Sequence, residues 1–193
     1  NGLARPDSLP QPADVSSSLG QFGLTLHERD LNALLVGQGL AFKGGCFHLR
    51  TKLPMGLGVT LVAVPRSHPD SVVFSIPFDQ IRGDKTGGMA AMLAGGLWGV
   101  IRPVVEKRIK KELNARHIPE ETVTVGQATE GKVKVGLVTL HLQPLNAWLW
   151  RQPPVQGLKV NLDALWATED QLQIVLGVFH IGPSRLPAEP GYR

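Results

Sequence analysis

The chain has 193 residues, of which 42% are hydrophobic and 19% are charged, and its formal net charge is +4. This balance excludes an intrinsically disordered chain, which would be rich in charge and poor in apolar residues. A single cysteine, Cys46, excludes an internal disulfide framework and a zinc site built on cysteines.

Both ends of the chain are polar and rich in proline. We expect residues 1–21 to be a flexible N-terminal segment, either the start of a mature chain whose leader was removed or an arbitrary boundary. Residues 182–193 are expected to be a flexible tail. Residues 22–181 are then long enough to form a single α+β domain with its own core.

The first predicted element is a helix over residues 25–35. Thr25 is the expected N-cap and Glu28, three residues later, completes a capping box, after which leucines recur on one face. Gly37 and Gly39 end this helix.

Alternating apolar and polar residues predict antiparallel strands with one buried face. The predicted strands span 47–53, 57–64, 72–79, 123–125, 132–142, 158–166 and 172–179. Pro77 indicates an edge or a bulge, and residues 168–170 (TED) are a predicted hairpin turn between the last two strands.

The segment 83–113 is small and apolar at first, then basic. Gly83-Asp84-Lys85-Thr86 does not match a phosphate-binding P-loop, because Asp84 interrupts the Gly-Lys pair and Phe78 stands where an earlier glycine is needed. Residues 87–105 approach the roughly 20 residues that span a bilayer. Five glycines, three alanines and a proline argue against spanning.

We therefore expect a long helix inside the sheet. Apolar residues recur at every fourth position from 89 to 113, so the apolar stripe winds around the helix, and its first half is apolar nearly all round. Pro103 would clash with the carbonyl of Gly99, which predicts a kink.

Two five-residue segments resemble each other: Leu-Asn-Ala-Leu-Leu at 31–35 and Leu-Asn-Ala-Trp-Leu at 145–149. Each precedes a loop and then an alternating strand. The echo favours a two-part architecture, although matches of five residues also arise by chance.

No clustered catalytic or metal-binding constellation is found, so we expect a protein that is not an enzyme and that uses no cofactor or metal. The segment 27–30 (HERD) lacks the second histidine of an HExxH site. Cys46 is interpreted as a buried thiol rather than a nucleophile. His48 and His141 are interpreted as surface or hydrogen-bonded side chains.

The basic residues Lys107, Arg108, Lys110 and Lys111 lie near the end of the long helix. They are not interleaved with aromatic residues, so nucleic-acid binding is not expected. A solvated helix face is the first interpretation of this cluster. Attraction to anionic lipid headgroups at a membrane surface is the alternative.

A helix reading LTLHERDLNALL, alternating strands, a long glycine-rich helix and further strands together resemble the bacterial members of the tubular lipid-binding (TULIP) superfamily. The element that carries the resemblance is Leu31-Asn32, and the architecture covers about residues 22–180. The resemblance implies a strongly curved antiparallel sheet wrapped around a long kinked helix. It also implies an acyl-chain groove between them and residence in the cell envelope or periplasm.

The leading hypothesis is therefore non-enzymatic binding of a lipid or fatty-acyl ligand in an apolar groove between the sheet and the long helix. The alternative is a structural or protein-interaction module with a filled core, and the cytoplasm stays open as a second location. The predicted groove residues are Leu49, Val59, Leu61, Phe74, Ile76, Met89, Met92, Leu93, Leu97, Leu162 and Ile174. Each of them would serve equally well in a filled core.

Overall fold

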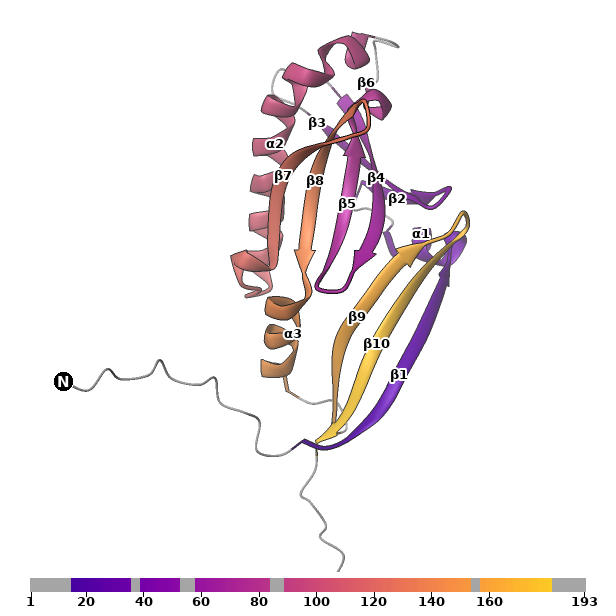
Figure 1. The fold of residues 1–193 in the computed structure, drawn as a ribbon, viewed down its shortest axis with the longest axis vertical. Coiled ribbons are helices and arrows are strands. Elements are labelled where there is room, and N and C mark those ends of the chain that lie inside the picture. The colour runs from indigo at the N-terminus through magenta and orange to yellow at the C-terminus, as the bar shows by residue number, and fades with distance from the viewer. Residues whose placement is uncertain (1–14, 36–38, 53–57, 84–88, 154–156, 182–193) are drawn as a thin grey trace, which may run out of the picture.

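The computed structural model describes residues 15–35, 39–52, 58–83, 89–153 and 157–181. Over these residues the protein is a mixed α+β structure with two antiparallel sheets and three α-helices (Figure 1). The strands are β1 (Val15–His27), β2 (Leu40–Lys43), β3 (Cys46–Lys52), β4 (Gly58–His68), β5 (Ser71–Pro77), β6 (Arg82–Gly83), β7 (Val123–Glu130), β8 (Val133–His141), β9 (Leu158–Ala167) and β10 (Gln171–Ile181). The helices are α1 (Glu28–Leu35), α2 (Met89–Ala115) and α3 (Leu142–Arg151). The predicted α+β class with antiparallel sheets is confirmed.

The larger sheet has seven strands in the order β2-β3-β4-β5-β8-β7, and β6 pairs with β4. Gly44 and Gly45 form the β2–β3 turn with φ angles of 58° and 73°. A Cβ on Gly45 would come 2.8 Å from the carbonyl oxygen of Thr168, in the turn between β9 and β10. The glycine therefore lets a hairpin of the larger sheet approach a hairpin of the smaller sheet.

The smaller sheet joins the two ends of the described chain, in the order β1-β10-β9. β1 pairs with β10 from Val15 opposite Ile181 to His27 opposite Gln171. The predicted hairpin turn at 168–170 is confirmed, since the amide of Thr168 donates to the carbonyl of Gln171 at 2.9 Å.

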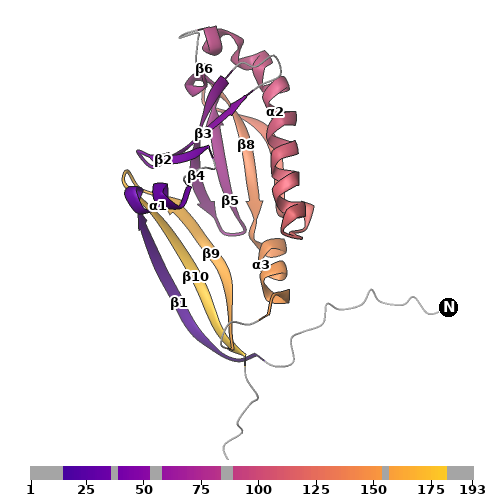
Figure 2. The same ribbon diagram turned by 180° about the vertical axis from the view of Figure 1, so that it is seen from behind.

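The main core lies where α2 packs on one face of the larger sheet (Figures 1 and 2). Its fully enclosed members include Val59 and Ile101, with no exposed surface, and Trp98, which is 2% exposed. The Trp98 ring lies against Gly136 of β8, where a Cβ would come 2.3 Å from the ring. Only glycine leaves room for the indole at this point.

Two sequence predictions are wrong at the first helix. α1 begins at Glu28, not near Thr25, so Thr25 does not cap it. Thr25 lies in β1 instead, and its Oγ1 donates to Oε1 of Gln173 in β10 at 2.8 Å. Residues 15–21, expected within a flexible segment, form the first part of β1, because pairing with the distant β10 supplies backbone partners that local sequence does not reveal. Residues 1–14 and 182–193 lie outside the described residues.

Candidate functional site

A groove of about 660 Å³ opens between α2 and the larger sheet. Its lining comes from α1, from β2 to β5, from β8 and from the second half of α2. The lining residues are Leu34, Leu35, Leu40, Phe47, Leu49, Leu61, Ala63, Phe74, Ile76, Val105, Arg108, Ile109, Glu112, Leu113, Arg116 and Val138. All but three of them are apolar, and the volume lies within the ~300–1,000 Å³ of ordinary ligand sites.

The floor of the groove is built by cross-strand neighbours on one face of the sheet. Leu40 of β2 lies opposite Leu49 of β3, which in turn lies opposite Leu61 of β4. Directly opposite residues of an antiparallel sheet point to the same face. The three leucines therefore form one continuous apolar row.

A second row contains the smallest side chain of the floor. Phe47 lies opposite Ala63, and Phe74 lies opposite Val138. The rings of Phe47 and Phe74 meet edge to face with their centroids 5.9 Å apart. Ala63 lines the groove beside these rings, and its single methyl group is the smallest side chain in the lining.

The wall opposite the floor is the second half of α2. Val105, Ile109 and Leu113 are spaced by four residues, so they lie on one side of the helix. Val105 and Leu113 are 7% and 8% exposed, and both anchor the helix to the body of the protein.

Charged side chains from the end of α2, and from Arg116 directly after it, form one rim of the groove. Arg108, Glu112 and Arg116 line it at successive four-residue steps. Nη2 of Arg116 lies 3.8 Å from Oε2 of Glu112, and the two side chains are 68% and 57% exposed. An exposed ion pair of this kind contributes about 0–1 kcal/mol. The rim carries two guanidinium groups and one carboxylate.

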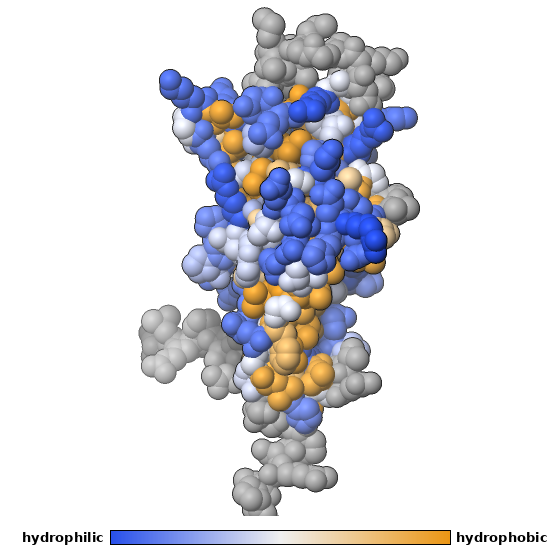
Figure 3. Space-filling view, turned by 90° about the vertical axis from the view of Figure 1, so that its right-hand side faces the viewer, coloured by the Kyte–Doolittle hydropathy of each residue, from blue (hydrophilic) through white to orange (hydrophobic). Residues whose placement is uncertain are grey.

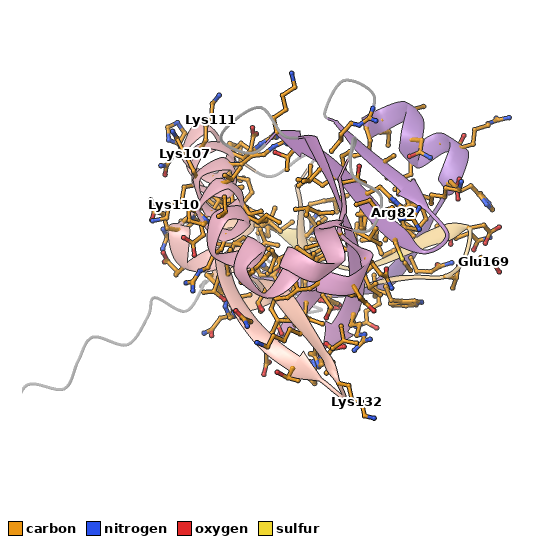
Figure 4. The ribbon with its side chains drawn as sticks, turned by 90° about the horizontal axis from the view of Figure 1, so that it is seen from above. Arg82, Lys107, Lys110, Lys111, Lys132 and Glu169 are labelled. Atoms are coloured by element: carbon orange, nitrogen blue, oxygen red, sulfur yellow. The ribbon has the colours of Figure 1, made fainter. Side chains whose placement is uncertain are left out.

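The other basic residues of α2 do not reach the groove. Lys107, Lys110 and Lys111 point outward from the helix, away from the sheet (Figure 4). Nζ of Lys110 lies 3.3 Å from Oε2 of Glu120 on that outer side. Of the four predicted headgroup residues, only Arg108 lines the groove.

The predicted apolar site residues divide into four groups. Leu49, Leu61, Phe74 and Ile76 line the groove. Val59 is fully buried in the core beneath α2. Leu162 belongs to β9 and Ile174 to β10, in the smaller sheet. The side chains of Met89, Met92, Leu93 and Leu97 lie outside the described part of the structure.

The apolar groove residues that α1, β2 and the second half of α2 contribute were not predicted from the sequence. Leu34 and Leu35 of α1 contribute to it, as does Leu40 of β2. Val105, Ile109 and Leu113 stand in the four-residue series that the sequence shows, but the glycine-rich first half of the helix drew the site prediction toward residues 89–97. The series itself was the signal for these three residues.

The internal sequence repeat is longer than five residues when the strands and helices are aligned as well. Residues 25–35 read TLHERDLNALL and residues 139–149 read TLHLQPLNAWL, so T, L, H, L, N, A and L coincide. In both copies a strand ends at the histidine and a helix begins at the next residue.

The asparagine of each copy makes the same pair of hydrogen bonds. Nδ2 of Asn32 donates to the carbonyl of Phe42 at 2.8 Å, and Oδ1 accepts from the amide of Phe42 at 2.6 Å. Asn146 bonds both backbone groups of Leu162 in the same way, at 3.0 and 2.8 Å. The motif thus clamps each helix to the strand that follows it and, in the first copy, places α1 beside the groove.

The described residues offer little for catalysis. No group of three or more His, Cys, Asp and Glu side chains among them could hold a metal ion. Burial raises the pKa of the Cys46 thiol, which lowers its reactivity. His141 shares a 3.0 Å hydrogen bond with Oγ1 of Thr124, and it lines a second, separate pocket together with Asp70 and Glu121.

No helix in the described part of the chain has the length and apolar character needed to cross a membrane. Comparison with family models, with curated proteins and with solved structures finds no match to this chain.

Proposed function

We propose that this protein binds a lipid or other acyl-chain ligand in the groove between α2 and the larger sheet, without catalysing a reaction. The observation that carries the proposal is the lining: thirteen apolar residues around about 660 Å³, with charge confined to Arg108, Glu112 and Arg116. A wall of this kind selects ligands by apolar burial rather than by hydrogen bonds.

The free energy gained by burying a long acyl chain is comparable to the cost of binding and ordering it. At roughly 0.8 kcal/mol per buried methylene, an acyl chain of about sixteen carbons gains about 13 kcal/mol. Association and ordering oppose this by about 4–15 kcal/mol. A measurable affinity therefore requires that most of the chain be buried, which favours long over short chains.

Filling the groove is the direct test. Ala63→Phe puts a ring into the space opposite Phe47, whereas Ala41→Phe makes the same change at an exposed position of β2. We expect native mass spectrometry with added palmitate to show a one-to-one complex for the wild type and for Ala41→Phe, and its loss for Ala63→Phe. Thermal unfolding checks that both variants fold. No uptake of palmitate by the wild type would reject the proposal.

The resemblance to the tubular lipid-binding superfamily extends the proposal to shape and location. In that arrangement the larger sheet curves around α2, the helix kinks at Pro103, and the protein works in the cell envelope or periplasm. Support comes from the placement of the groove between a sheet and a long helix. Fractionation of cells that express the full-length gene tests the location, and recovery in the cytoplasm alone would contradict it.

A second candidate function, docking of a protein strand, rests on the smaller sheet. Phe22 and Leu24 of β1 and Val160 of β9 are 53%, 45% and 37% exposed. They lie on one face, because they pair with alternate residues of β10: Leu24 lies opposite Ile174, Phe22 opposite Leu176 and Val160 opposite Val178. Figure 3 shows apolar surface gathered on the lower half of the molecule, where this sheet lies.

β1 also has an open edge among the described strands, since it pairs with β10 alone. Residues 15–26 contain no charge and no proline, the devices that usually protect an edge strand. Sedimentation of the wild type over a range of concentrations tests this function. Self-association that is lost in Phe22→Ser, but kept in the exposed control Val100→Ser on α2, would support it, and a monomer at every concentration with no strand-peptide binding would reject it.

A further inference from the structure

The charged residues that line the groove carry a net positive charge, which favours an anionic headgroup over a neutral or cationic one. Arg108 and Arg116 stand on either side of Glu112, so the rim carries a net charge of +1. The two arginines are eight residue steps apart, which corresponds to about 12 Å at the ~1.5 Å rise per residue of a helix. A headgroup at the middle of this rim is within reach of either guanidinium.

The ion pair between Glu112 and Arg116, which an anionic ligand would displace at Arg116, is weak. Glu112 and Arg116 are both more than half exposed, and their closest atoms are 3.8 Å apart. A guanidinium prefers a planar bidentate partner such as a carboxylate or a phosphate. An incoming anion can therefore exchange for the Glu112 carboxylate at little cost.

The size of the groove limits the number of chains. A methylene group is close in size to a water molecule, whose share of liquid volume is about 30 Å³. A groove of about 660 Å³ thus holds about twenty such groups. That is one chain of ordinary length, whereas a lipid with two such chains needs nearly twice the space.

Building on the proposed function, we infer that the ligand is a single-chain amphiphile with an anionic headgroup. Its chain lies along the floor of Leu40, Leu49 and Leu61, and its head is bound by Arg108 and Arg116. The shared chemistry is a carboxylate or phosphate on one acyl chain. A fatty acid and a lysophosphatidic acid are its two natural sources.

A matched series of palmitoyl compounds tests this inference, with displacement of a fluorescent fatty acid as the readout. Palmitate and 1-palmitoyl lysophosphatidic acid carry the anion, monopalmitoylglycerol is neutral, hexadecylamine is cationic, and dipalmitoyl phosphatidic acid has two chains. We expect at least one anionic single-chain compound to bind about tenfold more tightly than the neutral one, as expected for a charge-assisted hydrogen bond. Which of the two binds more tightly identifies the source.

Variants separate the rim from the rest of the helix. Arg108→Gln and Arg116→Gln should each weaken binding of the anionic compound several-fold and leave the neutral compound unchanged. Lys111→Gln, on the outer side of the same helix, should change neither. The preference should also shrink as salt is raised, because exposed charges are screened.

The outcomes distinguish failure of the single-chain anionic assignment from failure of the proposed lipid binding. Equal binding of the anionic, neutral and cationic compounds would overturn the inference and leave the proposed function intact. Equal or tighter binding of the two-chain compound would overturn the single-chain assignment. Failure of every compound to bind would reject the proposed function as well.

Discussion

Replacing the two clamping asparagines tests whether the repeated motif holds the groove-forming helix in place. The change is Asn32→Ala in α1 and, separately, Asn146→Ala in α3. Asn32 satisfies both the amide and the carbonyl of Phe42. Phe42 has no exposed surface, so water cannot replace the lost partners.

The expected loss follows from this geometry. Each buried group left without a partner costs about 1–3 kcal/mol. Two such groups at Phe42 give an expected loss of about 2–6 kcal/mol in the free energy of unfolding for Asn32→Ala. Asn146→Ala should cost less, because Leu162 is only half-buried. Asn32→Asp should also destabilise, since a carboxylate would face the Phe42 carbonyl without a hydrogen to donate.

Urea unfolding monitored by circular dichroism measures these losses, with Asn114→Ala on the exposed surface of α2 as the control. The control should lie within about 0.5 kcal/mol of the wild type. Because α1 lines the groove, Asn32→Ala should weaken ligand binding more than Asn146→Ala does. A loss below about 1 kcal/mol at Asn32 would refute the claim that the asparagine clamps α1.

Three further predictions concern single sites. Gly136→Ala should destabilise the protein by about 1–3 kcal/mol and change its tryptophan fluorescence, because the new methyl group overlaps the Trp98 ring; an unchanged emission spectrum would contradict this packing. Pro103→Ala should stabilise α2 by up to about 3 kcal/mol in urea unfolding, because the new amide can donate to the Gly99 carbonyl; a loss of stability would show that the proline is required there. Cys46 should react with a disulfide reagent more slowly than glutathione at about pH 8, because its raised pKa leaves less thiolate; an equal rate would show that the thiol is not protected.

The strands of the larger sheet were predictable because their signal is local. Alternation over seven or more residues identified β3, β4, β5 and β8 within a few residues of their ends. The pairing of β1 with β10 joins residues about 150 positions apart, and nothing within either segment specifies the partner. The start of α1 was misjudged for the same reason, since β1 extends through Thr25 to His27.

α3 was missed because the helix begins directly after a strand, with no turn residues between them to mark the boundary. Residues 132–142 alternate, and β8 ends only at His141, one residue before α3 begins. Recognition of the longer echo would have predicted this helix, because residues 25–35 already contained a helix signal. Internal repeats are therefore worth extending from their strongest core before elements are assigned.

The site was half predictable, since alternation shows which side chains share a face but not which part of the face is covered. Leu49, Leu61, Phe74 and Ile76 were predicted as inward-facing residues, and all four line the groove. Val59 satisfies the same pattern but is sealed beneath α2. The difference depends on where the helix lies along the sheet, which is a tertiary property.

Neighbouring basic residues of α2 lie on two different surfaces, one toward the groove and one toward the outside. With Val105 at zero and about 100° per residue, Ile109 and Leu113 lie at about 40° and 80° around α2. Arg108 and Glu112 lie at about −60° and −20°, and Arg116 follows directly after the helix ends at Ala115. Lys107, Lys110 and Lys111 lie between about 140° and 240°, on the opposite side of the helix. Figure 4 shows them pointing outward, in agreement with these angles.

No rotation of side chains brings those lysines to the groove, although Arg108 directly follows Lys107. A cluster that reads as one basic patch in sequence is thus two surfaces, one facing the groove and one facing outward. Charge changes on the outer surface should alter attraction to anionic membranes without altering ligand affinity, whereas changes at Arg108 or Arg116 should do the reverse.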